Sequence, residues 1–132
     1  MGHTIKLAAL GAVAFMVLDG VWLGVLMKNF YRDQLAPIVR LADGGIAPNW
    51  PAAFVVHALL GTGIAVFVIP RVSSVSLAAA YGALFGLVVY GVYDFTNYST
   101  LRQWPFVLTL ADVAWGAAAS AVAAAAVRSV VR

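Results

Sequence analysis

The chain has 132 residues, of which 64% are hydrophobic and 10% charged, and its mean hydropathy is +0.96. Roughly a quarter of the residues of an average water-soluble domain are charged, so this composition excludes such a domain. It predicts an integral membrane protein that forms one small domain over residues 1–132. The net charge of +3 comes from eight Lys and Arg spread along the chain, without the basic block of a nucleic-acid-binding surface. With no cysteine, the chain has no disulfide and no thiolate metal site.

Four apolar runs are each long enough to cross a bilayer as a helix, which takes about 20 residues. They cover residues 5–27, 51–70, 76–98 and 105–127. Proline at the start of the second and fourth runs is compatible with the first turn of a helix. Because the connections after the second and third runs are short, consecutive spans must be antiparallel neighbours. We therefore predict an all-α membrane four-helix bundle of up-and-down spans.

The longer connection, residues 28–50, separates the first two spans. Its first part, Lys28–Leu35, alternates apolar and charged residues at nearly helical spacing, which predicts a short amphipathic helix in the headgroup region. The sequence Asp43-Gly44-Gly45 should interrupt any helix there. Elsewhere, the small residues of Gly82–Gly86 and Ala117–Ala126 predict faces where helices pack closely.

The distribution of Lys and Arg leaves the membrane orientation open. Four cations fall on the side of the termini and four on the opposite side: Lys6, Arg71, Arg128 and Arg132 against Lys28, Arg32, Arg40 and Arg102. Because the excess of these residues sets topology, the tie permits either orientation or dual insertion.

Each predicted span carries one ionisable side chain near the same membrane face. Asp19, His57, Asp94 and Asp112 lie four to eight residues from the ends of their spans at that face, hence roughly 6–12 Å deep. Three carboxylates close together at low dielectric cannot all stay ionised unaided, so one or more of them must be protonated, paired with protonated His57 or Arg102, or bound to a cation. We predict that these four residues are catalytic groups for acid–base chemistry, with a divalent cation at the same cluster as an alternative.

The residues around this layer suggest a binding site that is open on one side. Asn97 and Arg102 are predicted to orient a polar head, and four aromatic residues are predicted to line the site: Trp22, Trp115, Tyr90 and Tyr98. The opposite half of the bundle has no ionisable side chain, which disfavours a continuous ion path.

Two segments share a short pattern. In Asp19-Gly20-Val21-Trp22 and Asp112-Val113-Ala114-Trp115, a tryptophan follows an aspartate by three residues, so both side chains lie on one helix face. An internal duplication would explain this, although a four-residue pattern is weak evidence for one.

The exit of the third span carries a resemblance to a known family. The run Tyr93–Pro105, with Leu18–Gly24 before it and Asp112–Gly116 after it, resembles a bacterial family of small predicted membrane proteins catalogued as a domain of unknown function, number twenty-one seventy-seven. The likeness covers essentially the whole chain, and its most specific part is Asp-x-Thr-Asn-x-x-Thr-Leu-x-x-Trp-Pro from position 94. It implies four spans in a bacterial inner membrane and supplies no activity.

Three functions remain in competition. The first is a site for a lipid headgroup or small amphiphile, with acid–base or metal-assisted chemistry and membrane lipid as partner. The second is a small proton- or cation-coupled transporter, in which a second copy of the chain completes the path as a homo-oligomer. The third is an accessory structural subunit of a larger membrane complex. Whether the protein is an enzyme stays open among them.

Overall fold

The computed structural model describes residues 1–131 and is almost entirely helical. Its long helices are α1 (Gly2–Val21), α3 (Trp50–Gly63), α4 (Val75–Thr100) and α5 (Phe106–Val130). A π-helical turn, Trp22–Leu26, continues α1, and a π-helical turn, Ile64–Val68, followed by the 3-10 turn Ile69–Arg71, continues α3. Arg132, one of the cations counted on the side of the termini, lies outside the described residues.

The four predicted spans are confirmed. The apolar helices long enough to cross a membrane cover Gly2–Leu26, Trp50–Arg71, Val75–Thr100 and Phe106–Val130. Two of their starts have side-chain caps. The Asn49 side chain accepts a hydrogen bond from the Ala52 amide (3.2 Å), and Ser74 Oγ accepts one from the Leu77 amide (3.2 Å). The fold is therefore the all-α, four-span bundle that the hydropathy pattern predicts.

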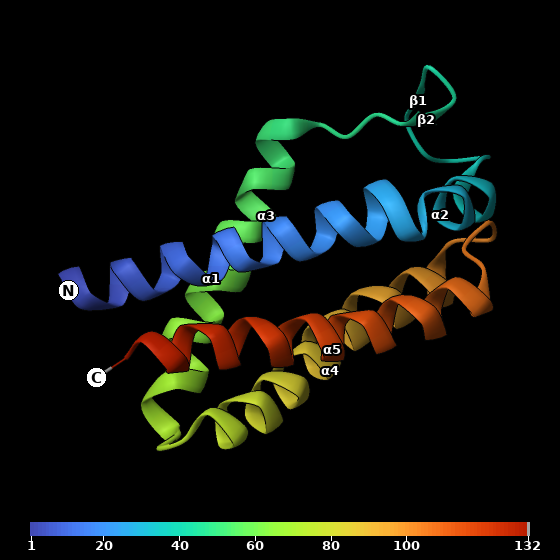
Figure 1. Cartoon of the computed structure of the whole chain (residues 1–132). Helices are drawn as coiled ribbons and strands as arrows, with labels where there is room; N and C mark the ends of the chain where they lie inside the picture. Colours follow the sequence, from blue (N-terminus) through green and yellow to red (C-terminus); the bar gives the residue numbers. More distant parts are fainter. Residues whose placement is uncertain (132) are drawn as a thin grey trace.

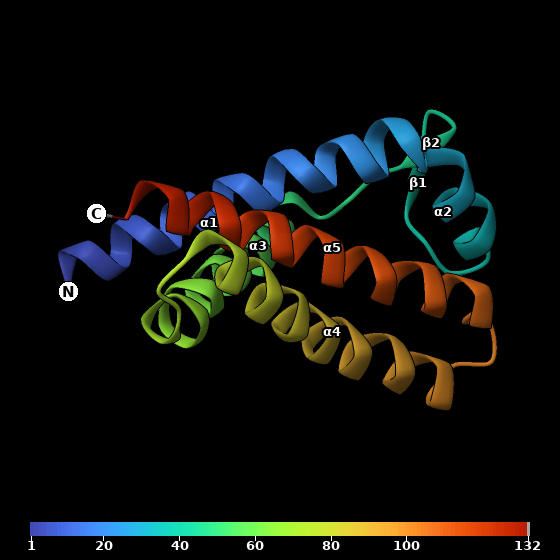
Figure 2. The ribbon, with the colours of Figure 1, turned by 60° about the horizontal axis from the view of Figure 1, so that its bottom comes forward.

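The helices run up and down, and the two ends of the bundle differ (Figures 1 and 2). Both termini lie at one end, together with the turn between α3 and α4, whereas α2 and the connection from α4 to α5 lie at the other end. Helix α4 packs mainly against α5, and α1 packs mainly against α3 and also contacts α5. Helix α3 is strongly inclined to the other three (Figure 1).

The predicted close packing of small residues is confirmed between α4 and α5. A side chain at Gly86 would collide with the backbone of Gly116 and with Ser120 Oγ. One turn earlier, a side chain at Gly82 would collide with the Ser120 backbone. Where lipid gives no hydrophobic drive for helices to associate, such close approach supplies the van der Waals contact that holds them together.

The segment between α1 and α3 contains the predicted amphipathic helix and a hairpin that was not predicted. Helix α2 (Lys28–Leu35) follows the first π-helical turn, and strands β1 (Leu41–Ala42) and β2 (Gly45–Ile46) pair antiparallel. Asp43 and Gly44 between the strands have φ of 51° and 76°. An Asp-Gly pair with both φ values positive forms a tight hairpin turn, so this sequence reverses the chain as well as interrupting the helix.

Candidate functional site

The structure brings together the four ionisable side chains that were predicted to share one layer, and we call Asp19, His57, Asp94 and Asp112 the polar cluster. Two of them form a hydrogen-bonded pair between α1 and α3. His57 Nε2 lies 2.9 Å from Asp19 Oδ2, and His57 Nδ1 lies 2.7 Å from the carbonyl oxygen of Ala53. Because a carbonyl can only accept, Nδ1 carries a proton, and a second proton must lie between Nε2 and the carboxyl. The Asp19–His57 pair therefore holds two protons, one on Nδ1 and one between Nε2 and the carboxyl.

The repeated Asp-x-x-Trp segments meet face to face. The indole rings of Trp22 and Trp115 are parallel, with centroids 4.4 Å apart. Trp115 Nε1 donates to Asp19 Oδ1 at 2.8 Å, so the tryptophan of the second segment binds the aspartate of the first. In the other direction, Trp22 is linked to Asp112 through one intervening hydroxyl. The two tryptophans were predicted to line a pocket, but here their rings lie against each other.

The intervening hydroxyl belongs to Tyr31 of α2, a residue that the sequence analysis did not include in the site. Tyr31 Oη accepts a hydrogen bond from Trp22 Nε1 (3.0 Å) and donates one to Asp112 Oδ1 (2.5 Å). The side chain is only 5% exposed, and within residues 1–131 it is the one buried residue of α2. Burial, reinforced by the charge of Asp112, raises the pKa of the Tyr31 hydroxyl far above its ordinary value of 10.0, so it stays a donor.

A signal for Tyr31 was present in the sequence. Met27, Tyr31 and Leu35 are spaced by four residues and form the inward face of an amphipathic helix. An amphipathic face of this kind is typical of a helix in the headgroup region, whereas in the structure α2 folds back onto the end of the bundle.

Asp94 is the residue whose bonding is incomplete. It is fully buried and lies beside the carboxyl of Asp112. Over residues 1–131, neither Asp94 oxygen has a hydrogen-bond donor. Two neighbouring carboxyl groups can hydrogen-bond to each other only if one of them carries a proton. A single shared proton would therefore give Asp94 one hydrogen bond, to Asp112.

The residues predicted to bind substrate are divided between the cluster and the surface. Tyr90 is partly buried and packs against Gly116, and Asn97 is partly buried one turn beyond Asp94. Tyr98 is 46% exposed and contacts the Phe106 ring, with ring centroids 5.2 Å apart. Arg102 is exposed and lines an open pocket of about 510 Å³ together with Ile38, Leu101 and Gln103. The structure thus places Tyr98 and Arg102 away from the carboxyls.

The arrangement of the cluster can be compared with what the predicted divalent cation would need. Within the described part of the chain, no three His, Asp or Glu side chains are arranged so that they could hold a metal ion. Asp19 is instead engaged with the His57 imidazole and Asp112 with the Tyr31 hydroxyl, while Asp94 lies beside Asp112. What this arrangement can do with its own side chains is hold and exchange protons.

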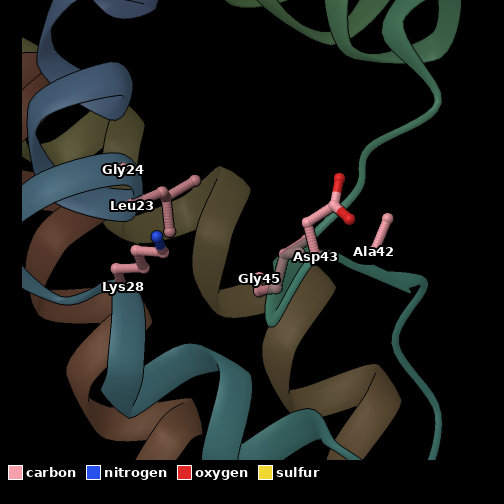
Figure 3. Close-up of a pocket in the computed structure, with 7 residues that line it drawn as sticks. Leu23, Gly24, Lys28, Ala42, Asp43 and Gly45 are labelled. Atoms are coloured by element: carbon pink, nitrogen blue, oxygen red, sulfur yellow. The ribbon is translucent and has the colours of Figure 1, made fainter.

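Beside the cluster, the π-helical turn, the start of α2 and the hairpin enclose an open pocket of about 360 Å³ (Figure 3). It lies at the same end of the bundle as α2. Seven residues line it: Leu23, Gly24, Lys28, Ala42, Asp43, Gly45 and Ile46.

Four apolar spans with a polar cluster near one end define a small helical membrane protein with ionisable groups inside the bundle. Residues 4–128 match a family described as "Predicted membrane protein (DUF2177)", and the chain belongs to this family. The match confirms the resemblance found at the exit of the third span. Neither a curated protein nor a solved structure matches the chain.

Proposed function

We propose that the protein binds the polar head of a membrane-embedded amphiphile at one face of a bacterial inner membrane and that this binding is coupled to exchange of a proton between the polar cluster and water. Asp94 and Asp112 form the exchanging pair, and Asp19 with His57 forms a second pair. Tyr31 and the two stacked tryptophans position the carboxyls. Membrane lipid is the partner that this arrangement implies.

One observation carries the proposal. Asp94 is fully buried and, over residues 1–131, neither of its oxygens has a donor. Leaving a buried polar group without a partner costs about 1–3 kcal/mol, and more if the group is charged. A buried ionisable group inside a membrane is by default a functional group, and a shared proton would give Asp94 one hydrogen bond without requiring space for a ligand. The phosphate and the ammonium of such a lipid head take no further proton at neutral pH, so the shared proton passes to water at the interface when the head binds, and the pair regains a proton from water when the head leaves.

The test counts protons released or taken up on binding. Short-chain phosphatidylethanolamine and phosphatidylglycerol are titrated into the detergent-solubilised protein by calorimetry, in buffers that differ in ionisation heat. The wild type should exchange up to one proton per bound lipid, and Asp94→Asn should exchange none while its helical circular dichroism is unchanged. Asp33→Asn is the matched control, because Asp33 is exposed on α2 and pairs with Arg32. Equal proton counts in the wild type and Asp94→Asn would contradict the proposal.

A structural role for the other carboxyl pair is the second candidate, and a specific contact favours it. Asp19 binds His57 on α3 and Trp115 on α5, so one carboxyl of α1 ties three helices together. If that is its whole function, Asp19→Asn should lower the melting temperature and leave the proton count unchanged.

A further inference from the structure

The open pocket of about 360 Å³ next to the polar cluster carries two opposite charges on different elements. Lys28 lies at the start of α2, and Asp43 lies in the turn of the hairpin (Figure 3). Throughout the described residues, the ion pairs are Arg32 with Asp33 and His57 with Asp19, so Lys28 and Asp43 do not pair with each other. Both charges are therefore free to meet a ligand.

The shape of the pocket depends on two glycines. A side chain at Gly45 would come within 3.3 Å of Lys28 Cε and 3.8 Å of Lys28 Nζ. The lysine side chain therefore passes close to Gly45, which has no side chain of its own. At Gly24, a side chain would meet nothing within 4 Å, so this position leaves the pocket open. The turn that carries Asp43 is held from outside the pocket, because Arg32 Nη1 donates to the Gly44 carbonyl at 3.2 Å.

The remaining lining is apolar, and the pocket lies at the end of a membrane span. Leu23 belongs to the π-helical turn that ends the first span, and Ile46 belongs to β2. Charged groups beside apolar residues, at the depth where a span ends, match an amphiphile whose head is polar and whose next segment is hydrocarbon.

We infer that this pocket binds a zwitterionic head, with a phosphate at Lys28 and a primary ammonium at Asp43. A purely anionic head would use the lysine and leave the aspartate as a repulsive neighbour, whereas a zwitterion satisfies both groups. This inference rests on the proposed function and names the class of its amphiphile. Leu23 follows Trp22 directly and Lys28 precedes Tyr31 by one helical turn, so the pocket is lined by the same two elements that carry Trp22 and Tyr31, and Tyr31 binds Asp112 of the polar cluster.

The experiment measures binding by the full-length protein in detergent, using native mass spectrometry and calorimetry. The probes are short-chain phosphatidylethanolamine, short-chain phosphatidylglycerol and free phosphoethanolamine. The variants are Lys28→Gln and Asp43→Asn, and an asparagine tolerates the positive φ of position 43. The matched controls are Arg40→Gln and Asp33→Asn, which remove an exposed charge of the same sign outside the pocket.

Each pocket variant should weaken binding of phosphatidylethanolamine about tenfold, the equivalent of one charge-assisted contact, and the controls should not. With phosphatidylglycerol, Lys28→Gln should weaken binding and Asp43→Asn should not. Binding of free phosphoethanolamine with the same dependence on both residues would show that the head alone is recognised. If the free head does not bind but the lipid still depends on both residues, recognition needs the lipid chain as well, and the zwitterionic assignment stands.

Unchanged affinity for phosphatidylethanolamine in Asp43→Asn would overturn the inference, and so would tighter wild-type binding of phosphatidylglycerol. These outcomes can be distinguished from a failure of the proposed function, because that function is tested by proton exchange and the pocket is tested by lipid affinity. Asp94→Asn should keep phosphatidylethanolamine affinity at the pocket while losing proton exchange. If instead the pocket variants bind normally and Asp94→Asn still loses proton exchange, only the zwitterionic pocket is wrong.

Discussion

The indole rings of Trp22 and Trp115 lie parallel, with centroids 4.4 Å apart, although 93 positions separate them in the chain. Each ring stands three residues after an aspartate. The Trp115 indole N–H donates to Asp19 of the first segment, and the Trp22 indole N–H donates to Tyr31, whose hydroxyl donates to Asp112 of the second segment. The stack therefore joins α5 to the π-helical turn that continues α1, next to the carboxyl of Asp19.

Replacing Trp115 by phenylalanine should destabilise the bundle. The variant keeps an aromatic ring for the stack but loses the donor to Asp19, leaving a partly buried carboxyl oxygen without its partner. We expect a loss of about 1–3 kcal/mol in the free energy of unfolding, measured by denaturant titration in mixed micelles. Trp50→Phe is the control, because Trp50 is 63% exposed. Equal stability of the two variants would show that the Trp115 hydrogen bond contributes nothing.

The coupling between Asp19 and His57 can be measured directly. In a double-mutant cycle with Asp19→Asn and His57→Gln, the two single changes should cost more together than the double change, because each leaves the other partner unsatisfied. The coupling free energy should be about 1–3 kcal/mol. Additive losses would mean that the 2.9 Å contact between the two side chains has no energetic role.

Because of Tyr31, the stability of the folded protein should fall as the pH rises in the alkaline range. The folded-state pKa of Tyr31 is raised, mainly by burial, whereas an unfolded tyrosine ionises near 10.0. Below that pH both states are protonated and the contribution is constant; above it only the unfolded state loses its proton, so stability falls as pH rises. The difference in ultraviolet absorbance between wild type and Tyr31→Phe should show no tyrosinate appearing near pH 10. A tyrosinate that appears there and is absent from the variant would contradict the buried hydrogen bond to Asp112.

Two glycines of α4 offer a matched comparison. An alanine at Gly86 would collide with the backbone of Gly116, whereas an alanine at Gly91 would meet nothing within 4 Å. Gly86→Ala should therefore lower the free energy of unfolding by about 1–3 kcal/mol, and Gly91→Ala should leave it unchanged or raise it by the gain in helix propensity. Thermal melting of both variants in one detergent is the measurement. Equal melting temperatures would show that α4 and α5 are not closely packed.

Much of the fold could be predicted because the lipid bilayer determines the pattern of apolar residues along the chain. A span needs about 20 apolar residues whatever its partners, so the four helices follow from composition and length. The gathering of Asp19, His57, Asp94 and Asp112 followed from depth alone, because antiparallel spans place residues at equal distance from one face side by side. Depth does not determine rotation about a helix axis, and for this reason the pairing of Asp19 with His57 rather than with another carboxyl was not predictable.

The contacts that were missed depend on short segments. The π-helical turn at Trp22–Leu26 has no signature in composition, yet it directs the chain into α2 and so delivers Tyr31 to Asp112. The hairpin at Asp43 and Gly44 was recognised only as a helix break, although an Asp-Gly pair is a strong turn signal. Both features lie between the first two spans, where hydropathy carries the least information.

The most direct test of the account asks whether Asp94 and Asp112 share a proton. Infrared difference spectra of the reconstituted protein at neutral pH, recorded against Asp94→Asn, report the carbonyl stretch of a protonated carboxyl. We expect one such band in the wild type that disappears in Asp94→Asn and persists in Asp33→Asn. A wild-type spectrum with no protonated-carboxyl band removed by the Asp94 change would mean that both groups are ionised, and would contradict the shared proton.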